Sequence, residues 1–324
     1  MRAKLIPLAV LVIAAAACAP AFGQAWPSKP IRLVVGFAPG GAADAASRAI
    51  GEPLGRILGQ SIIVDNRPGN GSSLAAEIVA KAPADGYTML IASPSSQSVN
   101  PVINKNLGYV PERDFIPVTK VTSSPLVVAV HPSLPVRTLA ELIAYAKQNP
   151  GKLNYGSSGN GSAPHMAAVL FSRVAGVEMV HVPFKGGGPA AQSLLAGDVQ
   201  LSFATPPSVL PLVQAGRLRG LAITTRAASP SIPGLPGMEE AGLRGYDLTF
   251  WYGFFVPTGT PAEVVRKLHT ATNQVLQRPE LRQLMAKEGT DVEGSKSPED
   301  FAAFTRENAK LWQQLARDTG AKVD

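Results

Sequence analysis

Strand-like and helix-like segments alternate along most of this chain, and this order restricts the fold more than any other feature of the sequence. Between residues 26 and 92, short apolar runs alternate with longer segments of helical periodicity, and turns rich in Gly, Pro, Asn and Asp separate them. A strand–helix–strand order predicts a mainly parallel sheet covered by helices. The predicted elements are strands 31–37, 61–65 and 87–92 and helices 44–58 and 73–81.

A second series of the same kind follows Pro125. Its predicted strands are 126–130, 152–156, 178–182, 199–203 and 218–224, and its predicted helices are 138–147, 164–175 and 189–196. The C-terminal part breaks the alternation, with an aromatic strand 246–256 followed by helices 261–276, 279–288 and 298–319.

Two α/β lobes follow from this order, because a helical C-terminal end can pack back on the first sheet. We predict two crossings between the lobes, near residues 124–130 and 246–254. Lobe 1 then comprises residues 26–127 and 250–324, and lobe 2 comprises residues 128–249.

The N-terminal segment 1–25 has the features of a signal peptide. Arg2 and Lys4 precede the apolar run Leu5–Ala17, and small residues offer cleavage sites after residue 23 or 25. Since the run is too short to span a bilayer, we predict export and removal of this segment. The alternative is a buried N-terminal helix.

The single cysteine, Cys18, lies within this segment. Cleavage beyond it leaves a mature chain without thiols, which excludes disulfides, cysteine nucleophiles and thiolate metal sites. A lipid-modified Cys18 is the alternative, although Ala15, Ala16 and Ala17 ahead of it lack the expected large aliphatic residue.

Charge is spread along the sequence without a run of one sign. The formal net charge is +7, and it is +5 without Arg2 and Lys4. This mild basic excess suits an anionic small molecule. Since no basic cluster is interleaved with aromatic residues, nucleic-acid binding is poorly supported.

Four loops of similar composition each lead from a predicted strand into a predicted helix. They are rich in glycine, alanine and hydroxyl residues and comprise residues 38–42, 93–98, 157–162 and 185–188. In open parallel sheets such loops gather beyond the carboxyl ends of the strands, where ligands bind. Backbone N–H groups at a helix N-terminus form an anion site. The alternative is that these are ordinary Gly-rich turns that bind nothing.

One small anion needs several of these loops at once. A micromolar Kd corresponds to about 8 kcal/mol, whereas a helix terminus supplies roughly 0.3–2 kcal/mol and a charge-assisted hydrogen bond roughly 1.5–3 kcal/mol. A cleft between two lobes meets this requirement. The phosphate-loop and dinucleotide-binding glycine patterns are absent, so a carboxylate is the simplest ligand.

Enzyme chemistry is poorly supported. The sequence lacks the G-x-S-x-G and H-E-x-x-H patterns, and its four histidines are scattered. His165 follows the third loop, where it can reach a ligand, and His181 is expected in the core. A triad of Ser162, His165 and Asp44 would make the protein a hydrolase. We expect instead no catalytic residues, no metal and no cofactor.

Four longer segments of the chain match a known family: PSKPIRLVVGFAPGGAAD (27–44), VDNRPGNGSSLAAEIVAKAPADGYTML (64–90), YGSSGNGSAPHMAAVLFSRVAGVEMVHVPFKGGGPA (155–190) and WYGFFVPTGTPAEVV (251–265). Through them the chain closely resembles the substrate-binding receptors of tripartite tricarboxylate transporters, also called the Bug family of periplasmic binding proteins. The resemblance runs from Trp26 to the C-terminus.

The resemblance implies a two-lobed, type II periplasmic binding protein fold that closes at a hinge on a small carboxylate. Such a receptor is a non-catalytic monomer that hands its ligand to membrane transporter subunits; the alternative partner is a membrane sensor kinase. The implied ligand-binding residues are those of the four loops and their flanks: Phe37, Ala38, Pro39, Gly40, Gly41, Ala42, Ala43, Ser93, Ser95, Ser96, Ser98, Ser157, Ser158, Asn160, Gly161, Ser162, His165, Lys185 and Gly186. We add Thr205, which follows the predicted strand 199–203.

Two positions depart from the family pattern. Gly36 stands where proline is common, which we interpret as a local adjustment at the end of a strand. Ala204-Thr205-Pro206-Pro207 stands where many relatives carry an acidic residue and an asparagine. Because an acid there would pair with an amino group, its absence predicts a ligand that has no positive charge.

Overall fold

The computed structural model describes residues 26–319. The predicted signal peptide, with Cys18, lies outside the described residues. Within them, no helix is both long and apolar enough to cross a membrane.

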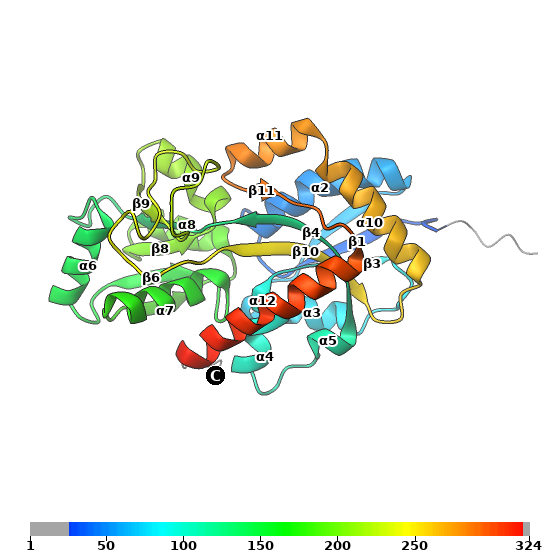
Figure 1. Ribbon diagram of the computed structural model, residues 1–324, viewed down its shortest axis with the longest axis horizontal. Helices are drawn as coiled ribbons and strands as arrows, with labels where there is room; N and C mark the ends of the chain where they lie inside the picture. The colour runs from blue at the N-terminus through cyan, green and yellow to red at the C-terminus, as the bar shows by residue number, and fades with distance from the viewer. Residues whose placement is uncertain (1–25, 320–324) are drawn as a thin grey trace, which may run out of the picture.

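Two sheets, each flanked by helices, form the two ends of an elongated molecule (Figure 1). The first sheet has the strand order β11-β4-β10-β3-β1-β2, and the second has the order β7-β6-β8-β5-β9. The strands of the first sheet are β1 (Ile31–Val35), β2 (Ile62–Asn66), β3 (Thr88–Ala92), β4 (Phe115–Ser124), β10 (Phe250–Pro257) and β11 (Asp291–Val292). Those of the second are β5 (Val127–Val130), β6 (Asn154–Ser157), β7 (Val180–Pro183), β8 (Leu201–Ala204) and β9 (Arg219–Ile223).

The predicted parallel pairing holds for the strands of each strand–helix–strand series, but both sheets are mixed. β1 pairs in parallel with β2 and β3, and β6 pairs in parallel with β7 and β8. The strands that come from a crossing run the other way: β10 is antiparallel to β3 and β4, and β5 is antiparallel to β8 and β9. β4 was missed, since its Pro117 and Lys120 interrupt the apolar pattern.

All eight predicted helices are present. They are α2 (Ala42–Leu58), α3 (Ser73–Ala80), α6 (Leu139–Gln148), α7 (Ala163–Ala175), α8 (Gly187–Ala196), α10 (Ala262–Leu276), α11 (Pro279–Lys287) and α12 (Pro298–Thr319). The structure adds α4 (Asn100–Ile103), α5 (Pro111–Asp114) and α9 (Pro206–Gln214), together with the short helical turns η1 (Asn70–Ser72) and η2 (Ser95–Val99). α9 was missed because it contains three prolines, which are typical of loops.

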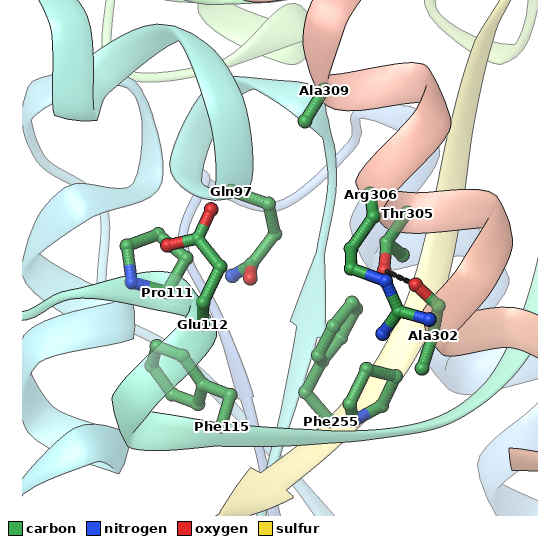
Figure 2. Close-up of a pocket in the computed structure, with 10 residues that line it drawn as sticks. Gln97, Pro111, Glu112, Phe115, Phe255, Ala302, Thr305, Arg306 and Ala309 are labelled. Carbon is green, nitrogen blue, oxygen red and sulfur yellow. Dashed lines mark hydrogen bonds between the residues drawn. The ribbon is translucent and has the colours of Figure 1, made fainter. Parts of the chain in front are cut away.

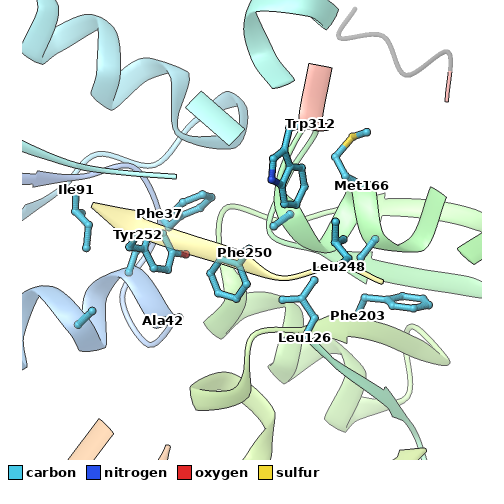
Figure 3. Close-up of a cluster of buried hydrophobic side chains, with 14 of the residues drawn as sticks. Phe37, Ala42, Ile91, Leu126, Met166, Phe203, Leu248, Phe250, Tyr252 and Trp312 are labelled. Carbon is cyan, nitrogen blue, oxygen red and sulfur yellow. The ribbon is translucent and has the colours of Figure 1, made fainter. Parts of the chain in front are cut away.

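The chain passes between the sheets twice, at neighbouring points. β4 ends at Ser124 in the first sheet and β5 begins at Val127 in the second; the return crossing precedes Phe250, which pairs with Ser124. One buried apolar cluster joins the two sheets, and Leu126, Leu248 and Phe250 belong to it (Figure 3). We propose the lobe boundaries at these crossings.

Both crossings are tied to β9 through Thr224, which is fully buried. The Thr224 N–H donates to the Leu126 carbonyl (2.9 Å), and Oγ1 accepts from the Leu126 N–H (2.7 Å). Oγ1 also donates to the Leu248 carbonyl (2.7 Å), whose own N–H donates to the Thr224 carbonyl (2.8 Å). One side chain therefore fixes where both connecting strands leave the second sheet.

Candidate functional site

The loop between β1 and α2 is held in shape by the carboxylate of Asp44. Its Oδ2 accepts from the Gly40 N–H (3.2 Å), and its Oδ1 accepts from Nε of Arg48 (3.0 Å) and Nδ2 of Asn66 (3.1 Å). Nδ2 of Asn66 also donates to the Phe37 carbonyl (3.0 Å). Burial on its own raises the pKa of Asp44, but these hydrogen bonds outweigh it and lower the pKa. Asp44 is therefore a charged support for the loop.

The first loop offers backbone rather than side chains. Phe37, Ala42 and Ala43 belong to the buried apolar cluster. α2 begins after Gly41, no side chain caps it, and its first internal hydrogen bond joins the Ala45 N–H to the Gly41 carbonyl (3.0 Å). The N–H groups of its first turn therefore have no helical partner.

The loop between β7 and α8 has the same character in the other sheet. α8 begins after Gly186 without a side-chain cap, and its first internal hydrogen bond joins the Ala190 N–H to the Gly186 carbonyl (3.2 Å). Pro189 has no N–H. Gly186, Gly187 and Gly188 thus carry the free donors at this helix start.

These two loops touch each other. The Ala38 N–H donates to the Lys185 carbonyl across the lobes (2.9 Å). A Cβ on Gly188 would lie 2.6 Å from the Pro39 carbonyl oxygen, and one on Gly41 would lie 3.3 Å from the Gly187 nitrogen. The glycines therefore leave room for the backbone of the opposite lobe.

The contact brings two positive helix ends together. The start of each helix carries roughly +0.5 of a unit charge from its macrodipole, and no side chain caps α2 or α8. Two such ends side by side repel each other unless negative charge lies between or beside them. An anion beside this contact would relieve the repulsion between the two helix starts.

A second contact between the lobes involves a loop that sequence reasoning left out of the site. A Cβ on Gly71, in the loop after β2, would lie 2.2 Å from the Asn160 carbonyl oxygen, and one on Gly161 would lie 2.2 Å from Oδ1 of Asn100. Nδ2 of Asn100 donates to the Asn70 and Gly71 carbonyls, both at 3.0 Å. The repeated Asn-Gly pairs at 70–71 and 160–161 are the sequence signal that could have indicated this contact.

In the loop after β6, most hydrogen-bond donors are already bonded to acceptors within the loop and the start of α7. Oγ of Ser162 accepts from the His165 N–H (3.4 Å) as the cap of α7, and Nδ1 of His165 accepts from the Gly161 N–H (3.1 Å). Oγ of Ser157 contacts Nε2 of His181 (2.6 Å) and the N–H of Gly159 (3.1 Å). The backbone of this loop therefore offers fewer free donors than the starts of α2 and α8. Its Ser158, which is buried, and Asn160 complete the predicted set.

Beneath this loop three rings are stacked. The His165 and His181 rings lie 4.0 Å apart and 6° from parallel, and Tyr155 stacks on the other face of His181 at 4.9 Å. Burial lowers the pKa of His165 to about 4. Burial, together with repulsion from His165, lowers the pKa of His181 to about 3. Both imidazoles are thus neutral at physiological pH.

Acid should destabilise the protein through this pair. Because both folded pKa values lie below the unfolded value near 6.5, the stability they contribute is complete above pH 6.5 and is lost as pH falls toward 4. Each histidine gives a slope of about 1.4 kcal/mol per pH unit in that window. Urea unfolding at pH 7.5, 6 and 5 measures it. His165→Gln should flatten the slope and His131→Gln should not; equal slopes in all three proteins would contradict the assignment.

The residues 93–98 form a helical turn rather than the predicted loop. η2 is a π-helical turn that follows Pro94 and continues directly into α4. Its serines are buried because α12 and Tyr109 cover the turn, and the Tyr109 hydroxyl donates to the Ser96 carbonyl (2.7 Å). Oγ of Ser93 is buried without a protein partner. The predicted residues here are Ser93, Ser95, Ser96 and Ser98, all 2% exposed or less.

Lys185 and Thr205 both lie near the start of α8. Lys185 is exposed, and its carbonyl makes the hydrogen bond to Ala38. Thr205 is buried, its Oγ1 lies 2.8 Å from Oγ of Ser208, and a Cβ on Gly187 would come within 3.3 Å of that Oγ1. The segment that departs from the family pattern therefore packs directly beneath the start of α8.

The hypothetical Ser162-His165-Asp44 triad is wrong. The Asp44 carboxylate is bound by Gly40, Arg48 and Asn66, while Nδ1 of His165 accepts from Gly161. Ser162 contacts the His165 backbone as a helix cap, so no nucleophile–base–acid chain forms. Within residues 26–319, no three His, Cys, Asp or Glu residues are grouped as a metal site would require.

The family model of the tripartite tricarboxylate transporter family receptor matches residues 46–321. The chain belongs to this family. Its relatives include Protein BugT of Bordetella pertussis, which is 32% identical over 325 residues that cover 100% of this chain and 99% of BugT. The family and the related solved structures are periplasmic solute-binding receptors with a two-lobed fold.

Two related receptors were solved with acids. The Rhodopseudomonas palustris protein Rpa4515 with adipate is 37% identical, with a TM-score of 0.88, and the match covers 92% of this chain and 100% of that one. MatC from the same organism, with bound malate, is 30% identical, with a TM-score of 0.84, and the match covers 90% of this receptor and 100% of MatC.

Proposed function

We propose that this receptor is exported, binds a small organic carboxylate between its lobes and delivers it to a membrane transporter of the tripartite tricarboxylate type. The observation that carries the proposal is the contact between two uncapped helix starts, α2 and α8, at Gly41 and Gly187. A carboxylate beside this contact accepts hydrogen bonds from backbone N–H groups of both lobes. The closed form therefore binds it better than an open form does, and binding shifts the population toward closure.

The charges around this contact favour an acid without an amino group. The one carboxylate of the first loop, Asp44, is already bound by Gly40, Arg48 and Asn66. β8 is followed by Thr205 and two prolines, which offer no negative charge. An ammonium group buried there would lack a counter-ion, which is costly. The adipate and malate in the two related structures support the same class of ligand.

A thermal-shift screen tests the ligand class. Succinate, malate, glutarate and adipate are compared with aspartate, which adds an amino group to the succinate skeleton. An acid at 100 times its Kd stabilises the fold by about 2.7 kcal/mol, and should raise Tm by roughly 5 °C or more. Aspartate should bind at least about tenfold more weakly than succinate or malate, because its ammonium group is desolvated without a partner.

Equal binding of aspartate and succinate would contradict the proposed ligand class, and no shift with any acid would contradict carboxylate binding.

Delivery is tested in cells: deletion of the gene should abolish uptake of the radiolabelled acid, and the intact gene should restore it. N-terminal sequencing of the periplasmic protein should find a start after residue 23 or 25. A start at Cys18 would instead identify a lipid-anchored receptor.

A further inference from the structure

A cavity of about 100 Å³ lies in lobe 1, and none of the residues that line it belongs to the starts of α2 and α8. η2, α5 and α12 surround it, and the first residues of β4 and the last residues of β10 form its base (Figure 2). Phe115 is the first residue of β4 and Ser124, at the crossing, is the last. At the rise of an extended strand the two are about 30 Å apart. The Phe115 end of the cavity is therefore far from the crossing, whereas Gln97 belongs to the turn η2 that also carries Ser95, Ser96 and Ser98.

The walls of the cavity are flat and apolar. Phe115 and Phe255 meet edge to face, with ring centres 6.5 Å apart and planes at 81°. Tyr109 packs against the other side of Phe115 at 5.7 Å, which holds that ring in place. Thr305 lines the cavity too, but its hydroxyl donates to the Ala302 carbonyl (2.9 Å). These walls accept a planar apolar group.

An unused amide lies inside the cavity. Gln97 is 7% exposed, its side chain extends into the space between Glu112 and Phe255, and Nε2 is buried without a protein acceptor (Figure 2). Its backbone N–H, by contrast, is bonded to the Ser93 carbonyl (3.1 Å). A buried amide without partners is unfavourable. A ligand that both donates and accepts would satisfy it in either orientation.

The rim carries one charge of each sign. Glu112 and Arg306 are exposed and lie on opposite sides of the opening (Figure 2). An anion near Arg306 also faces Glu112, and a cation near Glu112 also faces Arg306. The rim therefore favours an uncharged ligand, in contrast to the anion expected between the lobes.

We propose that this cavity is a second small-molecule site, for an uncharged molecule that combines a flat apolar ring with a carboxamide. The ring lies against Phe115 and Phe255, and the carboxamide pairs with the amide of Gln97. The residues that form this site are distinct from the starts of α2 and α8, and Gln97 is its one residue in the turn η2 that also carries predicted carboxylate-binding serines.

Benzamide is the probe, followed by saturation-transfer NMR and titration calorimetry on the purified protein. A Kd in about the millimolar range is expected for so small a ligand. Toluene, which lacks the amide, and benzoate, which is charged, should each bind at least about tenfold more weakly. Gln97→Leu should weaken benzamide by about tenfold. Ala302→Phe, which fills the cavity, should abolish binding, and Gln283→Leu on exposed α11 is the matched control.

Three results would overturn the proposal. The first is no benzamide signal up to about 20 mM, well above the expected Kd. The second is equal benzamide affinity in wild type and in Ala302→Phe, with both proteins folded by circular dichroism. The third is displacement of benzamide by the organic acid that gives the largest thermal shift, which would place the probe between the lobes.

Discussion

Gly188→Ala should weaken binding of the preferred organic acid roughly 5- to 150-fold. The reason is that overpacking destabilises the closed form by about 1–3 kcal/mol. The added Cβ would lie 2.6 Å from the Pro39 carbonyl oxygen of the opposite lobe. Because that neighbour is backbone, the lobes must separate to relieve the contact. The clash is absent whenever the lobes are apart, so the unliganded fold should survive. Isothermal titration calorimetry measures the loss.

Gly51→Ala is the matched control for this variant. Gly51 is also a helical glycine, but its Cβ would meet Cγ2 of Ile62 at 3.4 Å, an ordinary contact within lobe 1. It should leave affinity unchanged. Alanine also favours a helix over glycine by about 1 kcal/mol, so neither variant should lower Tm without ligand. Full affinity in a folded Gly188→Ala protein would show that the contact between α2 and α8 is not part of the bound state.

Thr224→Val should cost about 2–6 kcal/mol of unfolding free energy, because two buried backbone groups each lose a partner worth roughly 1–3 kcal/mol. Valine nearly preserves the shape of threonine, so the loss isolates the hydroxyl. The Leu126 N–H and the Leu248 carbonyl would both be left unpaired within the core. Urea denaturation, fitted with a common m-value, gives the difference.

Thr224→Ser separates the hydroxyl from the methyl group. Serine keeps both hydrogen bonds, so most of the stability lost in Thr224→Val should return. If the serine variant is as unstable as the valine variant, packing of the methyl group rather than the hydrogen bonds explains the effect. If neither variant loses stability, the two crossings do not depend on Thr224.

Local patterns in the sequence predicted the helices and most strands because they depend on nearby residues. α12 begins with Pro298 and carries a long amphipathic repeat, and α2 begins just after the paired glycines Gly40 and Gly41. The direction of the strands did not follow from such patterns. Whether β4 and β10 run parallel or antiparallel to β3 depends on how the chain crosses between the sheets, which no local period records.

The candidate site was predicted in part for the same reason. The loops that begin α2 and α8 were identified from glycine and helix-start signals, and the family resemblance named the same positions. The supporting residues Asn66 and Asn100 were missed, because an asparagine after a strand or within a turn has many ordinary uses. Only the fold shows that Asn66 reaches Asp44 and that Asn100 reaches Gly71.

The sequence by itself determined which segments are helical, where glycine interrupts them, and that the chain resembles the receptors of tripartite tricarboxylate transporters. Tertiary structure decided that the glycines of one loop face the backbone of another, that the Asp44 carboxylate is already bound, and that Gln97 lies unpaired in a cavity of lobe 1. The physical reason is range. Helix propensity and turn chemistry act over a few neighbouring residues, whereas contacts across the lobes join Gly41 to Gly187 and depend on the whole path of the chain between them.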